Sequence, residues 1–161
     1  MGIRFNADEV LEMAIKIERN GAAFYRKAAS QHPGEESMAM LEKLAAMEDE
    51  HEKTFLELRA QLTEQERKEQ VYDPDGEVSL YLEALSDSHG GEGSPSAADA
   101  LTGEESLAEI ITIALGLEEK SILYYLGLRD FVPETLGRNK VDKVIAEERK
   151  HLTQLSDLLK K

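Results

Sequence analysis

The sequence predicts an all-α fold, a four-helix bundle built from two repeated helical hairpins that a long crossover connector joins. Four segments carry apolar residues at the three- and four-residue spacing of amphipathic helices, and no segment alternates as a β-strand would. Residues 14–25 align without a gap with residues 114–125, and residues 41–51 align with 141–151 at the same offset of 100 positions. The 161 residues suffice for one domain with a real core.

The first hairpin is expected over residues 6–67. Asn6 and Glu9 have the spacing of a capping box, so the first helix should begin there. The His-Pro-Gly sequence at 32–34 should end this helix, because proline breaks helical hydrogen bonding. A second helix should follow this turn, and its apolar stripe fades near Arg67.

An acidic connector is expected over residues 68–103. Residues 69–119 include 13 acidic residues and no Lys or Arg, so this stretch carries −13 of the formal net charge of −14. The connector has turn residues at 72–76 and a Gly- and Ser-rich loop at 88–96, with room for a short helix over 77–85. We interpret its charge as that of a solvated connector; a calcium-binding or docking role is the alternative, although the sequence has no EF-hand loop.

The second hairpin is expected over residues 104–159. The third helix should begin near Glu104 and end at the Phe-Val-Pro sequence 131–133, and the fourth should run to about Leu159. Short turns within the hairpins and a long connector between them suit a bundle with one long crossover. We therefore expect residues 1–161 to form a single domain.

Both halves of the repeat carry charged residues within their apolar stripes. Each half has one Glu on its first helix and a Glu-x-x-His motif on its second, and the motif's spacing places its Glu and His on one helix face. The two sets are Glu18, Glu48 and His51 in the first half and Glu118, Glu148 and His151 in the second. Hairpins related in this way should pack about a pseudo-twofold axis, with the matched residues facing one another.

The chemistry of this set indicates a metal pair. Four buried carboxylates without compensation would cost many kcal/mol or would have to take up protons. Two divalent cations balance four carboxylates, and neutral imidazoles add nitrogen ligands, as in di-iron and di-manganese carboxylate bundles. A lone Glu-x-x-His is more often a solvated helix face, but two at a shared offset on apolar faces are a much stronger signal. We expect two iron ions per chain, with manganese or zinc as alternatives.

Other residues near the motifs are expected to lie outside the site. Glu119 and Glu147 are each one position, or about 100° of helix, from Glu118 and Glu148 and should point away from the seam. Glu50 should face solvent or a neighbouring helix. Two further histidines, His32 and His89, have no Glu three positions before them and should face solvent.

Tyr25 and Tyr125 occupy matching positions two helical turns beyond Glu18 and Glu118. One interpretation is that they are core aromatic residues with satisfied hydroxyls. The other is that they hydrogen-bond to ligand carboxylates, or act as a local electron source, which makes them the candidate catalytic residues. The two interpretations are compatible.

With this motif set the sequence resembles the ferritin-like superfamily and, within it, the rubrerythrin-type di-iron proteins. The resemblance covers residues 6–67 and 104–159 and implies that Glu48 and Glu148 bridge two metals. It implies terminal ligands at the other positions, namely Glu18, Glu118, His51 and His151. The function that it implies is a non-haem di-iron oxidoreductase that reacts Fe(II) with peroxide or O2. Iron storage in a larger oligomer and a bundle with a structural metal site are the alternatives.

The sequence departs from rubrerythrins in two ways. Rubrerythrins carry an additional Glu one turn after the ligand of the third helix, and Ser121 stands at that position here. Full-length rubrerythrins also carry a rubredoxin domain with a Cys-ligated iron, whereas these 161 residues include no Cys. The electron donor is therefore expected to be a separate molecule, and the site is expected to lack the additional carboxylate that rubrerythrins have.

Composition limits the classes of partner and the cellular compartment that we expect for this chain. A chain this acidic should be repelled by nucleic acid and by anionic membranes, and the absence of Cys excludes disulfides, Cys-ligated metals and thiol chemistry within it. No apolar stretch approaches the roughly 18 residues of a membrane helix, and residues 1–6 do not resemble a secretion signal. We expect a cytoplasmic protein and, by analogy with ferritin-like bundles, a homodimer.

Overall fold

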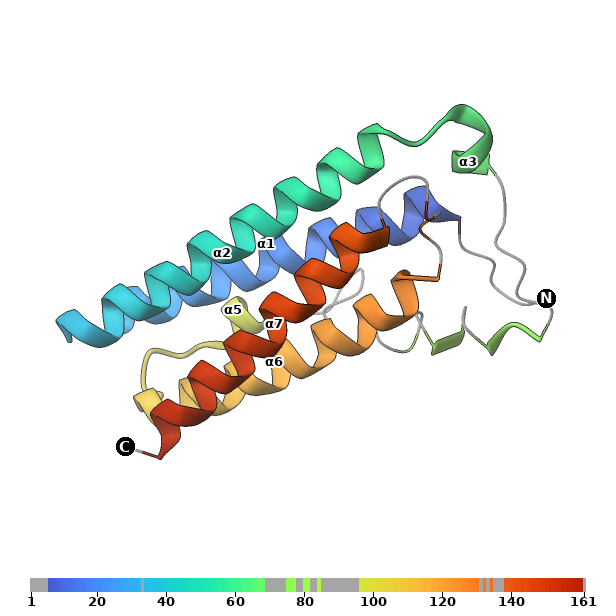
Figure 1. Cartoon of the computed structure of the whole chain (residues 1–161). Coiled ribbons are helices and arrows are strands. Elements are labelled where there is room, and N and C mark those ends of the chain that lie inside the picture. The colour runs from blue at the N-terminus through green and yellow to red at the C-terminus, as the bar shows by residue number, and fades with distance from the viewer. Residues whose placement is uncertain are drawn as a thin grey trace.

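The computed structural model describes residues 6–32, 34–68, 75–77, 80, 81, 84, 96–130, 132, 134 and 138–160. Within these residues there is no β-strand, so the expected all-α class is confirmed. The four long helices are α1 (Ala7–Gln31), α2 (Glu35–Ala60), α6 (Leu107–Leu128) and α7 (Arg138–Leu159). α1 pairs with α2 and α6 with α7, and the two hairpins lie against each other as a four-helix bundle (Figure 1). No helix in the described ranges is both long and apolar enough to cross a membrane.

The predicted capping box starts α1. The Glu9 N–H donates to Oδ1 of Asn6 over 2.9 Å, and the Asn6 N–H donates to Oε2 of Glu9 over 3.0 Å. Two N–H groups that the helix cannot satisfy internally are thereby paired. α1 ends at Gln31, next to the expected His-Pro-Gly turn, with His32 as its C-cap.

The second helix is shorter than the sequence predicted. α2 ends at Ala60, and a separate short helix, α3 (Glu64–Lys68), covers the stretch in which we expected α2 to fade. Thr63 and Glu66 explain the break. The Thr63 hydroxyl accepts from the Glu66 N–H over 3.2 Å, and the Glu66 carboxylate accepts from the Thr63 N–H over 2.8 Å. This reciprocal pairing begins a new helix instead of extending the old one.

The end of the connector also differs from expectation. A short helix, α5 (Ala97–Ala100), forms next to the segment that we had expected to be loop, and it begins at a capping box between Ser96 and Asp99. Its backbone is tied to α1, because Nζ of Lys27 donates to the carbonyl oxygen of Ala98 over 2.7 Å. The third long helix then begins at Leu107 instead of near residue 104, with Ser106 as its N-cap.

Most of the connector lies outside the described residues. Of the short helix expected over 77–85, four residues are described as helical, namely Glu77, Leu80, Tyr81 and Ala84. The loop predicted at 88–96 and the Phe-Val-Pro sequence at 131–133 are largely outside the described residues as well. α6 itself ends at Leu128, before that sequence.

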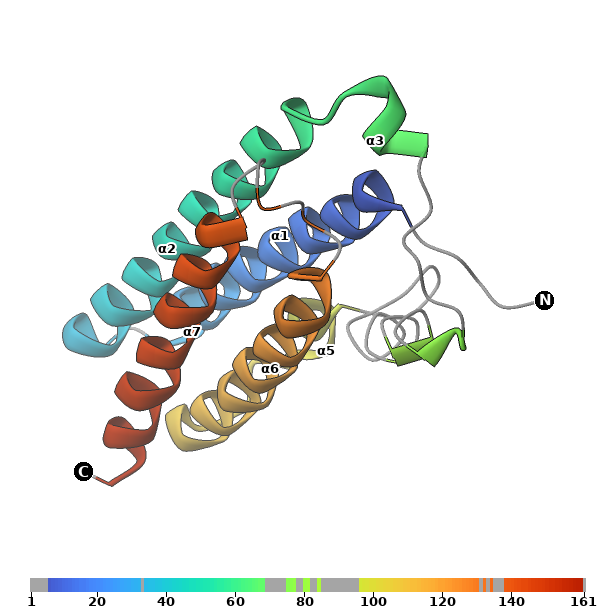
Figure 2. The same ribbon diagram turned by 45° about the vertical axis from the view of Figure 1, so that its right-hand side comes forward.

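The core consists of two apolar clusters separated along the bundle. The first joins the start of α1 to the end of α2, the end of α6 and the start of α7, and it includes Val10, Leu11, Phe55, Leu58, Tyr124, Leu128 and Val141. The second joins the opposite ends of the same helices and includes Phe24, Ala28, Leu41, Leu44, Ile110, Ile111 and Leu155. Figure 2 shows the same arrangement of two hairpins from a second angle. The residues between the two clusters are polar and buried.

Candidate metal centre

Six buried Glu and His side chains come together between the two apolar clusters. They are Glu18 on α1, Glu48 and His51 on α2, Glu118 on α6, and Glu148 and His151 on α7. None is more than 5% exposed. All six residues that the repeat singled out therefore share one place in the fold, and each of the four long helices contributes at least one.

The six side chains form two overlapping groups. One ligand atom from each of Glu18, Glu48, His51 and Glu148 can be chosen so that all four atoms lie within 4.8 Å of one another. The same holds for a second group, which consists of Glu48, Glu118, Glu148 and His151. Glu48 and Glu148 belong to both groups. Each group is a candidate site for one metal ion.

The two shared carboxylates lie between the two histidines. Glu148 has Oε1 at 3.0 Å from Nδ1 of His51 and Oε2 at 2.9 Å from Nδ1 of His151. Glu48 has Oε2 at 3.9 Å from Nδ1 of His51 and Oε1 at 3.5 Å from Nδ1 of His151. Each shared carboxylate thus has one oxygen toward each histidine.

The two other carboxylates each approach one histidine. Glu18 has Oε2 at 3.5 Å from Nδ1 of His51, and Glu118 has Oε1 at 3.6 Å from Nδ1 of His151. The cluster thus has two carboxylates that approach both histidines and two that approach one histidine each.

Several polar atoms of this cluster have no hydrogen-bond partner among the described residues. Those grouped around the two shared carboxylates are Oε2 of Glu18, Oε1 of Glu48, both carboxylate oxygens of Glu148, and Nδ1 of both histidines; Nε2 of His151 is unpaired as well. Each buried polar atom left unpaired costs roughly 1–3 kcal/mol. Divalent cations placed among these atoms would satisfy them together, and a set of carboxylates and imidazoles suits iron, manganese or zinc. The residues present therefore fit a metal pair.

Crowding of negative charge changes the pKa of the carboxyl groups. Burial, and then the neighbouring carboxylates of Glu48 and Glu148, raise the pKa of Glu18 well above its usual value. Burial and the nearby Glu148 raise the pKa of Glu118 to about 7. Burial and the nearby Glu48 would also raise the pKa of Glu148. Hydrogen bonds with the two adjacent histidines and with Glu118 more than offset this effect and lower the pKa below its usual value. The cluster therefore favours positive charge in its midst.

The neighbouring carboxylates raise the pKa values of the two histidines. Burial alone would lower the pKa of His51, but the carboxylates of Glu148 and Glu18 more than offset it and raise that pKa to about 11. In the same way Glu118, Glu148 and Glu48 overcome the effect of burial and raise the pKa of His151 to about 12. Without metal the two rings carry the compensating positive charge, and metal binding would displace their protons.

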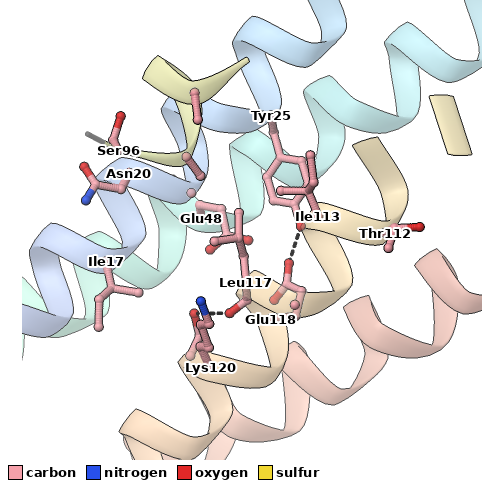
Figure 3. A pocket seen from close by; sticks show the side chains of 15 residues that line it. Ile17, Asn20, Tyr25, Glu48, Ser96, Thr112, Ile113, Leu117, Glu118 and Lys120 are labelled. Atoms are coloured by element: carbon pink, nitrogen blue, oxygen red, sulfur yellow. Dashed lines mark hydrogen bonds between the residues drawn. The ribbon is translucent and has the colours of Figure 1, made fainter. Parts of the chain in front are cut away.

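The two tyrosines connect the hairpins. Tyr25 of α1 donates its hydroxyl hydrogen bond to Oε1 of Glu118 on α6, and Tyr125 of α6 donates to Oε1 of Glu18 on α1. Figure 3 shows the first of these contacts. Each tyrosine therefore holds the carboxylate of the opposite hairpin, and each is at most 1% exposed. Burial, reinforced by the carboxylates, raises both tyrosine pKa values well above the usual range, so the hydroxyls remain protonated donors.

Glu147 differs from its expected role. It belongs to neither candidate metal group, but its Oε2 lies 3.1 Å from Nε2 of His51, on the ring edge opposite the cluster. Repeat symmetry did not reveal this residue, because the matching position in the first hairpin is Met47. The sequence feature that could have indicated Glu147 is its position directly before the second Glu-x-x-His motif, because a metal-binding histidine commonly donates its second N–H to a carboxylate.

The structure agrees with the expectation for Glu119 and Glu50 but differs from it for His32. Glu119 and Glu50 are exposed, as expected. His32 is half-buried instead of solvent-facing, and its Nε2 has no hydrogen-bond partner in the described ranges. His32 is the C-cap of α1, directly after the last residue of that helix. His89 lies outside the described residues.

Comparison with known proteins supports the fold and the type of site. The rubrerythrin family model matches residues 9–159. A solved structure from Thermotoga maritima, assigned as a ferritin-like diiron-carboxylate protein, matches 100% of this chain and 99% of its own, with a TM-score of 0.79 and 22% sequence identity. At that identity the similarity concerns the fold. No curated protein matches the sequence.

Proposed function

The chain belongs to the rubrerythrin family, and from this premise we propose that it is a non-haem di-iron oxidoreductase that reacts Fe(II) with peroxide or O2. The observation that carries the proposal is the position of Glu48 and Glu148, each with one oxygen toward each histidine. Carboxylates placed in this way can bridge two metal ions. Bundles with this ligand set hold metal pairs that react with oxidants.

The two candidate groups define the expected ligands. Glu18 and His51 would complete the ligands of one metal, and Glu118 and His151 those of the other. Two divalent ions would balance the four carboxylates and occupy the space that the unpaired oxygen and nitrogen atoms face. The iron pair would supply the two electrons that reduction of a peroxide O–O bond requires.

The rest of the chain would orient this set and shield it along the bundle axis. Hydrogen bonds from Tyr25 and Tyr125 fix the rotation of the two terminal carboxylates. The apolar clusters above and below shield the site from bulk water on these two sides, which strengthens electrostatic interactions within it. Both tyrosines also lie close enough to serve as local electron sources.

Return of the metals to Fe(II) requires electrons from outside this chain. The 161 residues include no Cys and hence no Cys-ligated iron, so we propose a separate electron donor. Ser121 supplies no seventh ligand comparable to a carboxylate, because its hydroxyl donates to the carbonyl oxygen of Leu117 over 3.1 Å. We therefore propose turnover with a fixed set of six ligands.

Metal analysis tests the first part of this proposal. Protein reconstituted anaerobically with Fe(II) should retain about two iron ions per chain after desalting. Glu118→Ala should lose metal, whereas the matched variant Glu119→Ala, one position away on the exposed face of α6, should retain it. Wild-type protein that retains no stoichiometric metal would contradict the proposal.

Stopped-flow mixing with peroxide and with O2 tests the second part. An oxidoreductase should consume the oxidant and develop the near-ultraviolet band of oxidised, bridged iron. Light scattering on the same sample separates the alternatives, since a storage protein would be a large hollow oligomer and would load far more iron. A structural site would consume no oxidant, and removal of its metal would unfold the protein. For the oxidoreductase we expect a homodimer.

A further inference from the structure

A pocket reaches the candidate metal centre between the two hairpins. Its volume is about 380 Å³, and it is lined by residues of α1, α5 and α6, with Glu48 of α2 and Glu118 of α6 among them. In Figure 3, Glu48, Glu118 and Tyr25 project into the space between these helices. Neither histidine is among the lining residues in the described part of the chain. The pocket therefore meets the cluster at two of its carboxylates.

The burial of the six cluster residues agrees with this position. Glu48 and Glu118 are 5% and 3% exposed, whereas Glu148 and His151 are 0% exposed. The two carboxylates that line the pocket are thus the most exposed of the six side chains, ahead of His51 at 2% and Glu18 at 1%. A small molecule entering there would arrive beside the atoms proposed to hold the metals.

The pocket lies on the pseudo-twofold seam of the repeat. Three matched pairs, each separated by 100 positions, line it from opposite sides, namely Ile17 with Leu117, Asn20 with Lys120, and Gly21 with Ser121. The pair Gly21 and Ser121 is small on both sides. The seam is therefore open where two larger side chains would have met.

Gly21 controls the approach to Glu48. A Cβ built at this position would lie 3.4 Å from Cγ of Glu48 and 3.5 Å from its Oε2, so any longer side chain would extend over this carboxylate. Glycine inside a helix costs about 1 kcal/mol relative to alanine. Gly116, which also lies inside a long helix, lines the same pocket. The two glycines thus leave the pocket open at a cost in helix stability.

The end of the connector forms one wall. Ser96, Ala97 and Ala100 line the pocket, and α5 is held in place by the bond from Lys27 to the Ala98 carbonyl and by burial of Ala98 against the second apolar cluster. The side chains that α5 presents are small. The connector thus shapes the pocket without filling it.

We propose that this pocket is the access route and binding subsite through which a small anion or peroxide reaches the metal pair. The proposal rests on the proposed function, since it needs the metals in place. Ile17, Ile113 and Leu117 contribute apolar lining, and Glu48, Glu118 and Tyr25 contribute the polar lining next to the candidate metal centre. The pocket is larger than peroxide itself, with room for a small alkyl hydroperoxide.

The test uses azide as a small anionic probe of the iron(III)-loaded protein. Azide affinity is measured from the absorption band that appears on titration, in wild-type protein and in two variants that narrow the pocket, Gly116→Leu and Ser121→Leu; a Cβ added at Gly116 meets no atom within 4 Å, so this change fills the pocket without displacing a proposed ligand. Ala23→Leu is the matched control, because it adds the same side chain to an exposed position of α1. Iron content and thermal unfolding are measured for each variant first, so only folded, metal-loaded variants are compared.

Both narrowing variants should retain their iron and bind azide at least tenfold more weakly than wild type, while Ala23→Leu binds it as wild type does. Unchanged azide affinity in either folded, iron-loaded variant would overturn the access route and leave the proposed function intact. Wild-type protein that binds two iron ions but no azide would overturn it as well. Failure of wild-type protein to bind iron would instead count against the proposed function.

Discussion

Nε2 of His51 lies 3.1 Å from Oε2 of Glu147, which comes from the opposite hairpin. The same ring has its Nδ1 toward the carboxylate cluster, so Glu147 can fix both the tautomer and the orientation of the imidazole. His151 has no such partner in the described residues, because its Nε2 makes no hydrogen bond. The two halves of a nearly symmetric centre therefore differ at their histidines.

Removing the Glu147 acceptor should weaken metal binding. Glu147→Met, which copies the residue at the matching position 47, should lower the affinity for a divalent metal by about 10- to 100-fold, as is usual for partners of metal ligands. Glu147→Gln keeps an acceptor oxygen and should show a smaller loss. Chelator competition with Zn(II) measures both. Glu50→Gln, an exposed position on α2, serves as control, and an equal loss there would contradict the assigned role.

Tyr25 and Tyr125 should contribute to metal affinity through the carboxylates to which they donate hydrogen bonds. Tyr25→Phe and Tyr125→Phe keep the buried ring but remove a hydrogen bond to Glu118 or to Glu18. We expect each to lower metal affinity by about 10-fold or more, because the terminal carboxylate loses its orientation.

Tyr124→Phe is the matched control for these two variants. Its hydroxyl donates to the carbonyl oxygen of Val10 over 3.1 Å and lies in the apolar cluster. This change should cost about 1 kcal/mol of unfolding free energy and leave chelator competition unchanged. Equal metal affinity in all three variants would show that the tyrosines only fill the core.

A charged network at the start of α1 should make stability depend on acidity. Oδ1 and Oδ2 of Asp8 accept from Nε and Nη2 of Arg59 over 3.0 and 2.9 Å, and Arg67 contacts the same carboxylate. The hydrogen bonds from Arg59, with the charge of Arg67, hold the pKa of Asp8 below its usual value.

Because this pKa is lowered in the folded state, the network stabilises the fold above the usual pKa of Asp8 and loses that effect as the pH falls below about 4. Asp8→Asn should therefore lower the unfolding free energy by roughly 1 kcal/mol or less near pH 7, since the groups are partly exposed. Urea unfolding should show the difference shrinking toward pH 3. A constant difference across this range would contradict the electrostatic explanation.

Gly116→Ala should stabilise the protein. The glycine lies inside α6, and a Cβ added there would meet no atom within 4 Å. Alanine should raise the unfolding free energy by about 0.5–1 kcal/mol through helix propensity alone. Thermal unfolding of the metal-free protein measures this gain. At Gly21 the same change brings a Cβ to 3.4 Å from Glu48, so its gain should be smaller.

Much of the fold and of the site could be predicted from local patterns. Helical periodicity and the Asn6–Glu9 capping box placed the long helices, and the 100-residue repeat selected six side chains that the structure brings together. Boundaries were less accurate where a second capping pair intervened, as Thr63 and Glu66 do after α2. Such a pair is a short-range signal that competes with a longer apolar stripe.

The sequence by itself determined which residues are on which helix face, and hence which Glu and His had to be buried together. Only the tertiary structure decided that Tyr25 holds Glu118 instead of Glu18, that Glu147 reaches His51, and that a pocket opens beside Glu48. The physical reason is that periodicity defines directions around one helix axis. The offset and rotation between helices, which set contacts across the bundle, arise from the packing of all four helices at once.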